Sequence, residues 1–253
     1  MNIIHVSSYE ELSSRAADII AVQVILKPDR ILGLATGSSP IGTYKELIAR
    51  YELGDLDFSQ VSSVNLDEYR GLSPENDQSY RYFMNNHLFN HVNVRPECTH
   101  VPNGLEPDSD KACADYNKII EEAGGIHLFM GGVGEDGHLA FNEPFSSLVS
   151  RTRVKSLTYD TILVNSRFFD GDISKVPTTA LTVGVGTVMD AKEVMVLAFG
   201  HKKGPALKEA IEGAYSHKCT LSALQAHHRN LQRWSLKCRL ECRSHRLEKL
   251  RYE

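Results

Sequence analysis

Short apolar runs alternate with longer amphipathic segments along most of the chain. The apolar runs are typical of strands buried on both faces of a sheet, and several of the longer segments follow a residue that can cap a helix. This alternation predicts an α/β fold with a mostly parallel central sheet flanked by helices. The predicted strands are residues 3–6, 30–35, 61–66, 126–130, 152–157, 180–185 and 193–199, and the predicted helices are residues 8–28, 41–51, 79–89, 110–123, 160–168, 186–191 and 203–214.

The composition is that of a globular protein in a reducing compartment. Of the 253 residues, 42% are hydrophobic and 24% are charged, which are ordinary shares for such proteins. No stretch approaches the roughly 20 apolar residues of a membrane span, and the early acids Glu10 and Glu11 disfavour a signal peptide. The five cysteines are spaced without a paired framework. We therefore expect a cytoplasmic protein.

Segment 131–144 is the strongest candidate for an active-site loop. It follows a predicted buried strand, and its four glycines permit tight turns and close approach to a ligand. His138 can exchange a proton near neutral pH, and Asp136 and Glu143 can fix its tautomer and raise its pKa. Taken alone, a single histidine in a glycine-rich turn is more often a surface or structural residue than a catalyst. A metal site is a further alternative, although the loop has no second histidine at a metal-binding spacing.

A second candidate loop, residues 36–39, joins a predicted strand to a predicted helix. Backbone N–H groups at a helix N-terminus bind anions, so this loop could hold a phosphate. It matches neither the P-loop nor the dinucleotide-binding pattern, so a nucleotide is not indicated. A turn that only caps the helix is an equally good interpretation of these residues.

Charged residues beside other predicted elements complete the set of candidates. Asp67 and Glu68 follow the predicted strand 61–66, where a carboxylate can act as a base on a ligand held over the sheet. Arg167 and Lys203 could pair with a phosphate. Taken singly, such residues are more often solvated surface groups.

Five motifs, in order along the chain, resemble those of the glucosamine-6-phosphate deaminases in the glucosamine/galactosamine-6-phosphate isomerase family. They are LATGSSP at 34–40, NLDEY at 65–69, GGVGEDGH at 131–138 with FNEP at 141–144, SRTR at 150–153, and NSRFF at 165–169. The resemblance runs from residue 1 to about residue 225 and implies a Rossmann-like three-layer fold. The implied reaction converts glucosamine 6-phosphate and water to fructose 6-phosphate and ammonia, with no metal or organic cofactor.

The same resemblance implies a role for each candidate residue. Asp67 matches the general base that moves a proton between C2 and C1 of the sugar. His138 matches the group that assists ring opening, and Asp136 and Glu143 match the acids that orient it. The residues that match the phosphate site are Thr36, Gly37, Ser38, Ser39, Arg167 and Lys203.

Many members of the family are hexamers that N-acetylglucosamine 6-phosphate activates at a separate site between subunits. The residues that match this allosteric site are Ser146, Arg153, Lys155 and Ser156. We therefore expect a homo-oligomer, with a hexamer favoured, that binds an amino-sugar phosphate substrate and this activator. Neither nucleic acid nor a membrane is an expected partner.

The resemblance ends near Gln225, which divides the chain into an expected α/β domain at 1–226 and a divergent tail at 227–253. The tail holds eight Lys or Arg and three acids. Its leucines at 231, 236, 240 and 247 would suit an amphipathic helix; a nucleic-acid patch and an altered reading frame are alternatives, and we favour a plain structural tail or an altered frame. Loss of the strand that the family has here would remove a partner from the sheet and lower stability.

Two other functions stay open on the sequence. A 6-phosphogluconolactonase-like hydrolase shares the implied fold and a phosphate loop, although the presence of both Asp67 and His138 argues against it. A sugar-phosphate-binding regulator without turnover is the second alternative, and the unusual tail is the feature that favours it.

Overall fold

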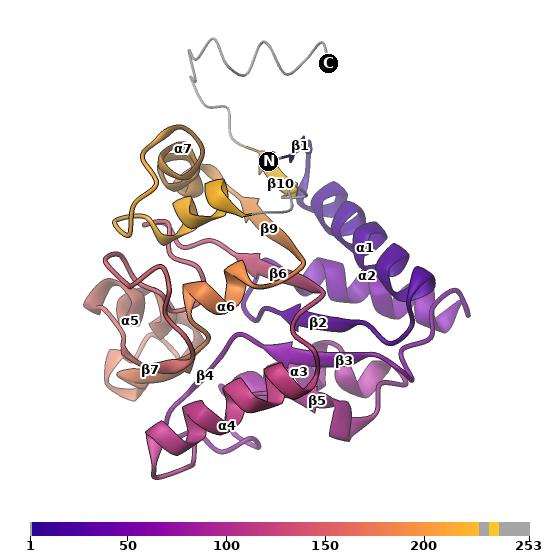
Figure 1. The fold of residues 1–253 in the computed structure, drawn as a ribbon, viewed down its shortest axis with the longest axis horizontal. Coiled ribbons are helices and arrows are strands. Elements are labelled where there is room, and N and C mark those ends of the chain that lie inside the picture. Colours follow the sequence, from indigo (N-terminus) through magenta and orange to yellow (C-terminus); the bar gives the residue numbers. More distant parts are fainter. Residues whose placement is uncertain (1, 228–232, 238–253) are drawn as a thin grey trace.

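A seven-stranded sheet, parallel throughout, forms the centre of the computed structural model, which describes residues 2–227 and 233–237 (Figure 1). The strand order is β1-β10-β9-β6-β2-β3-β5. The strands that follow β2 in the chain, β3 and β5, lie on one side of it in the sheet. The strands that follow β6, β9 and β10, lie on the opposite side. The strands are β1 (Asn2–His5), β2 (Ile31–Leu34), β3 (Ser62–Asn65), β5 (Thr99–His100), β6 (Leu128–Gly132), β9 (Glu193–Phe199) and β10 (Arg233–Lys237).

Helices cover both faces of this sheet, which confirms the predicted fold class. Along β6, Leu128 and Met130 join one apolar cluster while Phe129 joins the other, because successive side chains of a strand point to opposite faces. The first cluster packs against α1 (Tyr9–Leu26), α2 (Ile41–Glu52) and α3 (Tyr80–His87), and the second against α4 (Ser109–Glu122), α6 (Val185–Met189) and α7 (Gly204–Glu212). The predicted alternation of strands and helices therefore corresponds to three layers.

A second, smaller sheet corrects part of the sequence-based expectation. It is antiparallel and consists of β4 (Asp67–Tyr69), β8 (Thr179–Thr182) and β7 (Arg153–Ser156), in that order. The predicted strands 152–157 and 180–185 belong to this sheet, and Asp67 and Glu68 lie in a strand where a loop was expected. An apolar run predicts a strand but does not indicate its partner, which is decided here by the tertiary contacts.

Side chains cap several of the helices, among them α1 and α3. Ser8 accepts a hydrogen bond from the backbone N–H of Glu11, Ser79 from Tyr82, and Thr158 from Thr161 at the start of α5 (Tyr159–Asn165). These bonds satisfy N–H groups that have no partner inside the helix. The capping residues of α3 and α5, Ser79 and Thr158, both line the main cavity of the protein.

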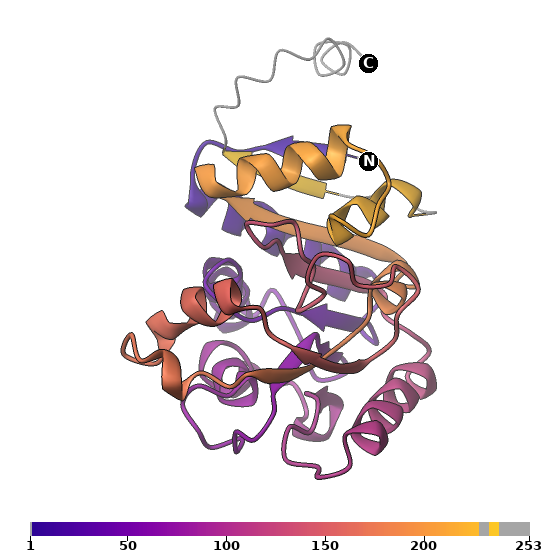
Figure 2. The ribbon, with the colours of Figure 1, turned by 90° about the vertical axis from the view of Figure 1, so that its left-hand side faces the viewer.

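The described part of the tail forms strand β10, which lies between β9 and β1 (Figures 1 and 2). The alternative of an amphipathic helix is therefore wrong for 233–237, which includes Leu236. The other three leucines of that pattern lie outside the described residues. The sheet has a strand at this position, so the expected loss of a partner does not occur, and the domain boundary at residue 226 stays a prediction.

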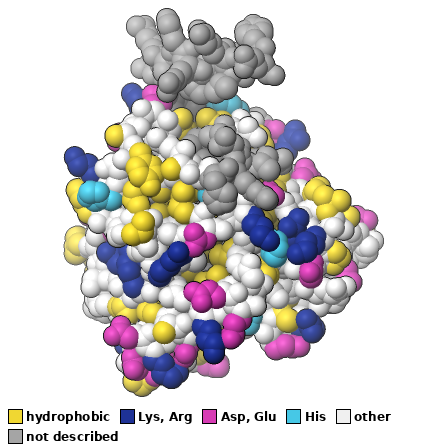
Figure 3. All heavy atoms as spheres, viewed as in Figure 1, with side chains coloured by type: hydrophobic (Ala, Val, Ile, Leu, Met, Phe, Trp, Pro, Cys, Tyr) yellow, Lys and Arg dark blue, Asp and Glu magenta, His cyan; other side chains and the backbone are white. Residues whose placement is uncertain are grey.

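Acidic and basic side chains are interspersed on the face of the molecule seen in Figure 3. On this face the charges offset one another, which disfavours binding of a polyanion there. No helix among the described residues is long and apolar enough to cross a membrane.

Candidate active site

A cavity of about 1160 Å³ opens beyond the carboxyl ends of β2 and β6. The strands β2 and β6 are neighbours, and the strands that follow each of them in the chain lie on opposite sides of the pair. Open α/β sheets bind ligands at such a switch in strand order. The cavity brings together predicted site residues from five separate segments of the chain. Those that line it are Thr36, Gly37, Ser38, Ser39, Asp67, Asp136, His138, Arg167 and Lys203.

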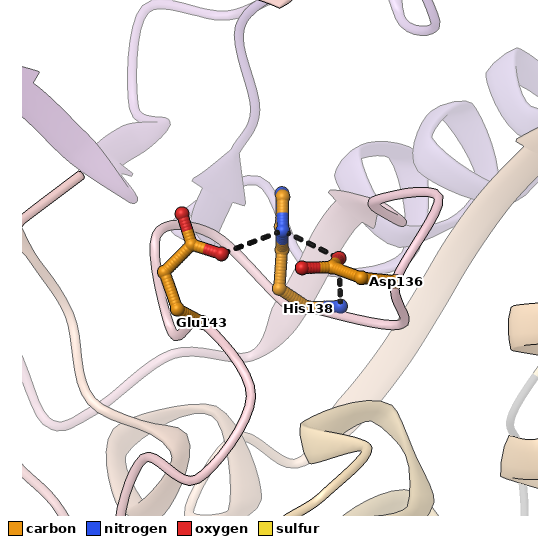
Figure 4. Close-up of side chains that lie close together, drawn as sticks. All are labelled: Asp136, His138 and Glu143. Atoms are coloured by element: carbon orange, nitrogen blue, oxygen red, sulfur yellow. Dashed lines mark hydrogen bonds and ion pairs between the residues drawn. The ribbon is translucent and has the colours of Figure 1, made fainter. Parts of the chain in front are cut away.

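His138 stands between two carboxylates (Figure 4). Its Nδ1 lies 2.7 Å from Oδ1 of Asp136 and 3.5 Å from Oε2 of Glu143. Burial alone would lower the pKa of His138, but the two carboxylates raise it to about 9. The imidazole is therefore protonated at neutral pH, and its second nitrogen, Nε2, remains for a ligand in the cavity.

The acids on either side of His138 are stabilised as anions. Burial alone would raise the pKa of Asp136, but contacts with His138 outweigh that effect and lower it to about 2. The pKa of Glu143 is also lowered, because the contacts with His138 and Thr161 outweigh its burial. The group thus has a cation held between two anions, which fixes the ring and its charge together.

Two glycines make this arrangement possible. At Gly134 a Cβ atom would come within 2.5 Å of the His138 ring and 2.6 Å of Oδ1 of Asp136. Gly137 has a φ of +86°, and a Cβ there would meet Sγ of Cys219 at 2.5 Å. These glycines therefore let the backbone of segment 131–144 pass close to the histidine and its partner, while the expected close approach to a ligand stays a prediction.

Glu143 lies behind His138 and does not line the cavity. Its side chain is 4% exposed, and Oε1 accepts hydrogen bonds from Thr161 at 2.6 Å and from Thr158 at 3.3 Å. Sequence reasoning missed both threonines, since hydroxyl residues near a helix start usually serve only as caps. Here they also tie the start of α5 to the acid that contacts His138.

Asp67, the first residue of β4, presents a buried carboxyl group to the same cavity. Burial and the neighbouring carboxylate of Glu68 raise the pKa of Asp67 to about 8, and the charge of His138 opposes this rise. Glu68 does not line the cavity; it accepts hydrogen bonds from the backbone N–H groups of Tyr69, Tyr80 and Arg81. Glu68 therefore joins β4 to the N-terminus of α3 and keeps Asp67 in place.

The other end of the cavity is formed by loop 36–39 at the start of α2. Gly37 has a φ of +89°, a conformation that favours glycine, and Pro40 precedes the helix without a side-chain cap. Arg167 is exposed and lies over the ring of Phe168, with its guanidinium carbon 4.6 Å from the ring centre. Lys203 is half-buried, and burial lowers its pKa while Glu135 and Asp136 oppose that change. A loop at a helix N-terminus and two cationic residues thus line one region of the cavity, a combination that suits an anion.

The donor atoms of Asp136, His138 and Glu143 all lie within 4.8 Å of one another, close enough to contact one metal ion. A histidine must be neutral to bind a metal. The two carboxylates raise the pKa of His138 to about 9, so a proton competes for the site near neutral pH. A metal ion could bind here only after His138 had lost that proton.

The four residues predicted to form an activator site lie outside this cavity. Ser146 is buried, and its hydroxyl has no hydrogen-bond partner among the described residues. Arg153, Lys155 and Ser156 lie on β7, and Nη1 of Arg153 donates to Oδ1 of Asn142 at 2.8 Å. None of the four lines the cavity, so any ligand that they bind would occupy a second site.

Comparisons with known proteins show the family to which the chain belongs. The family model for glucosamine-6-phosphate isomerases/6-phosphogluconolactonase matches residues 9–233. A glucosamine-6-phosphate deaminase of Treponema denticola is 51% identical over 236 residues, which cover 91% of this chain and 87% of that protein. Glucosamine-6-phosphate deaminase 1 of Bos taurus is 52% identical over 236 residues, covering 91% of this chain and 82% of the relative.

Solved structures give the same result at the level of the fold. One described as a monomeric glucosamine-6-phosphate deaminase superposes with a TM-score of 0.90 at 37% sequence identity, covering 93% of this chain and 97% of that one. A 6-phosphogluconolactonase from Thermotoga maritima superposes with a TM-score of 0.72 at 17% identity, covering 92% and 97%. The second likeness shows a shared fold alone.

Proposed function

The chain belongs to the family of glucosamine-6-phosphate isomerases and 6-phosphogluconolactonases, and we propose that within it this protein is a glucosamine-6-phosphate deaminase. The reaction converts glucosamine 6-phosphate and water to fructose 6-phosphate and ammonia. Relatives that carry this name are 51% and 52% identical to the chain over nine-tenths of its length. The observation that carries the proposal is a buried carboxyl group, Asp67, and a protonated histidine, His138, in the same cavity as an anion-binding loop.

The phosphate of the substrate would bind at the loop end of the cavity. Backbone N–H groups and hydroxyls of residues 36–39 can donate to its oxygens, and Arg167 and Lys203 supply positive charge. A phosphate held there directs the other end of the sugar toward Asp67 and His138. Binding energy from the phosphate can thereby hold the reacting carbons in position.

Ring opening requires a proton donor at the ring oxygen. His138 carries a proton near neutral pH, and its Nε2 is the nitrogen that the two acids leave for the substrate. As the ring oxygen accepts this proton, the bond between C1 and that oxygen breaks, and the C1 hydroxyl loses its proton to give the aldehyde. Asp136 and Glu143 keep the imidazole oriented and stabilise its charge.

The open sugar then requires a base at C2, and Asp67 is the group proposed for it. The adjacent aldehyde makes the C2 proton acidic, so the carboxylate can remove it and return it to C1. This transfer converts the amine-bearing carbon to an imine. Water adds to that carbon and ammonia leaves, which gives the ketone of fructose 6-phosphate.

The direct test measures ammonia and fructose 6-phosphate together. Wild-type protein should release the two products in equal amounts from glucosamine 6-phosphate. Asp67→Asn removes the base while keeping the side chain's size, so we expect at least a hundredfold loss of both products. Equal rates for the wild type and this variant would show that Asp67 is not the base.

Two alternative functions are separated by the same assay. A 6-phosphogluconolactonase would hydrolyse its lactone and release no ammonia; the solved lactonase structures resemble the chain at 16–18% identity, which bears on the fold alone. A regulator without turnover would bind glucosamine 6-phosphate and release neither product. Ammonia formation at a substantial rate excludes both alternatives.

We also propose, on the resemblance, that the enzyme acts in the cytoplasm as a homo-oligomer, with a hexamer favoured, and needs no cofactor. Ser146, Arg153, Lys155 and Ser156 would bind N-acetylglucosamine 6-phosphate as an activator. The position of these four residues outside the cavity supports a separate site. Light scattering tests the assembly, and saturation curves that superpose with and without the activator would refute the allosteric proposal.

A further inference from the structure

Two tyrosine hydroxyls hold the loop that faces the phosphate end of the cavity. Tyr9, the first residue of α1, donates from its hydroxyl to the carbonyl of Ser38 at 2.9 Å, with the carbonyl of Ser39 at 3.2 Å as a second acceptor. Tyr44, in the first turn of α2, donates to the carbonyl of Ala35 at 2.5 Å. Neither tyrosine lines the cavity, so both act on the loop from outside it.

These bonds matter because a peptide loop has both donors and acceptors. An N–H group attracts a phosphate, whereas a carbonyl oxygen directed at the same phosphate repels it. The carbonyls on both flanks of residues 36–37 are bonded to groups outside the cavity. The N–H groups and hydroxyls of the loop are therefore left to form its inner surface.

Tyr9 also completes the start of α2. Pro40 stands at the N-cap and supplies no side-chain hydrogen bond to the helix. The backbone N–H of Gly42 donates instead to the hydroxyl of Tyr9 at 2.9 Å. A residue of α1 thus provides for α2 the acceptor that an N-cap side chain normally provides.

The helices α1 and α2 can make this contact because residue 42 is a glycine. A Cβ atom at Gly42 would lie 2.1 Å from Oγ of Ser13 and 3.0 Å from Cε1 of Tyr9. Only glycine permits the helices to approach closely enough for the Tyr9 hydroxyl to reach both Gly42 and Ser38. The position of the loop is therefore set from a neighbouring helix.

The ring of Tyr9 reaches the second part of the phosphate end. It packs edge-on against Phe199, with ring centres 5.7 Å apart. Phe199 is the last residue of β9 and lines the cavity, and the chain continues from it through Gly200 to Lys203. Tyr9 therefore contacts both the loop and the segment that leads to the cationic lysine.

We propose that Tyr9 and Tyr44 are positioning residues for the substrate phosphate: their hydroxyls hold the loop carbonyls outside the cavity so that its N–H groups can bind the anion. This inference rests on the proposed function, because it takes loop 36–39 as the phosphate site. It adds two residues that touch no substrate and that no motif of the loop includes.

The test compares Tyr9→Phe and Tyr44→Phe with the wild type. Each variant keeps the ring and loses one hydroxyl. We expect KM for glucosamine 6-phosphate and the inhibition constant of inorganic phosphate to rise together, by roughly 5- to 10-fold, with kcat within about twofold of wild type. Tyr51→Phe is the matched control, since Tyr51 lies on α2 and packs its ring on Phe58; both constants should stay at wild-type values there.

Tyr9→Leu sharpens the test, because it removes the contact with Phe199 as well as the hydroxyl, and should raise both constants further than Tyr9→Phe. Melting temperatures separate binding from folding. A lower melting temperature with both constants unchanged would make the tyrosines merely structural and overturn the inference. If phosphate inhibits the wild type and the Phe variants equally, the inference fails while the phosphate site stands. If the wild type neither binds phosphate nor releases ammonia, the proposed function fails as well.

Discussion

The two ends of the cavity are built from different groups. At the proton-transfer end, Asp67, His138 and Glu143 are side chains largely withdrawn from solvent, and their pKa values are shifted by burial and by one another. At the phosphate end, backbone groups of a short loop act together with an exposed arginine and a half-buried lysine. At the proton-transfer end, burial of the side chains and their mutual charges set the pKa values. At the phosphate end, the orientation of the backbone groups and cations sets the affinity for an anion. Substitutions at the first end should therefore change kcat and pH dependence, and those at the second should change KM.

The largest effect should follow from His138→Asn. Loss of the proton donor for ring opening should reduce kcat by about 10²- to 10⁴-fold with KM little changed. The small fraction of substrate already in the open form should still react in a rapid initial phase, followed by a slow phase limited by spontaneous opening. Rapid-quench measurement of ammonia checks both phases. Asp67→Asn is the control and should show no rapid phase; wild-type kcat for His138→Asn would contradict the assignment.

The buried base should also carry a cost in stability that depends on pH. The pKa of Asp67 is raised from 3.8 to about 8, mainly by burial. Above pH 3.8 the unfolded chain loses the proton of Asp67, whereas the native state keeps it up to about pH 8. The bound proton stabilises the native state, and this stabilisation is lost as pH rises from about 4 to about 8. Asp67→Asn has no charge to bury, so its free energy of unfolding should exceed that of the wild type at pH 9 by on the order of a few kcal/mol.

Urea unfolding at pH 4 and pH 9 measures this difference. The two proteins should have similar stabilities at pH 4, where the aspartic acid holds its proton in the native state. A difference that is the same at both pH values would come from packing, not from the charge of Asp67.

At the phosphate end, Lys203→Met should act on binding alone. A hydrogen bond to a charged group contributes about 1.5–3 kcal/mol, so KM and the phosphate inhibition constant should both rise by roughly 10- to 100-fold. The kcat at saturating substrate should stay within about twofold. Lys208→Met, an exposed lysine of α7 outside the cavity lining, is the control. A large fall in kcat for Lys203→Met would mean that the two ends are not separable.

The smallest expected effect is a shift in the pH profile. The base must be deprotonated and the acid protonated, so kcat/KM should rise with pH through about 8 and fall through about 9, the pKa values of Asp67 and His138. Glu143→Gln removes one of the carboxylates that raise the pKa of His138. The falling limb of the kcat/KM profile should therefore shift to lower pH by about one unit. Thr158→Val removes the longer bond to Glu143 together with the cap of α5, but it leaves the shorter bond from Thr161, so it should move this limb by much less.

Sequence reasoning predicted most of the main sheet because buried strands leave a direct signal. The runs at 30–35 and 193–199 hold no polar side chain after their first residues, Arg30 and Glu193, and the structure has β2 and β9 there. The candidate loops were also identifiable, since glycines, hydroxyls and acids cluster directly after a predicted strand. Those loops meet at one cavity because the carboxyl ends of neighbouring parallel strands share one edge.

Features that depend on pairing between distant segments were not predictable. Strand β4 has three residues, two of them acidic, so only its pairing with β8 makes it a strand. Thr161 and Tyr9 each resemble ordinary residues at a helix start, and only the fold shows that they hold Glu143 and loop 36–39. The strand at 233–237 lacks a clear apolar run, and its position between β9 and β1 comes from the sheet.

The position of β10 also has a consequence for how the protein is made. In the described sheet β1 is an edge strand whose sole neighbour is β10, so the first strand of this sheet to be synthesised can pair only after the last one has been made. The other five strands of that sheet can assemble while the ribosome is still adding residues, leaving the edge of β9 open. Completion of the sheet then requires closure of the whole segment from β1 to β10, a slow step. A polypeptide that ends early would keep that edge open, where chaperones or another unfinished chain can bind.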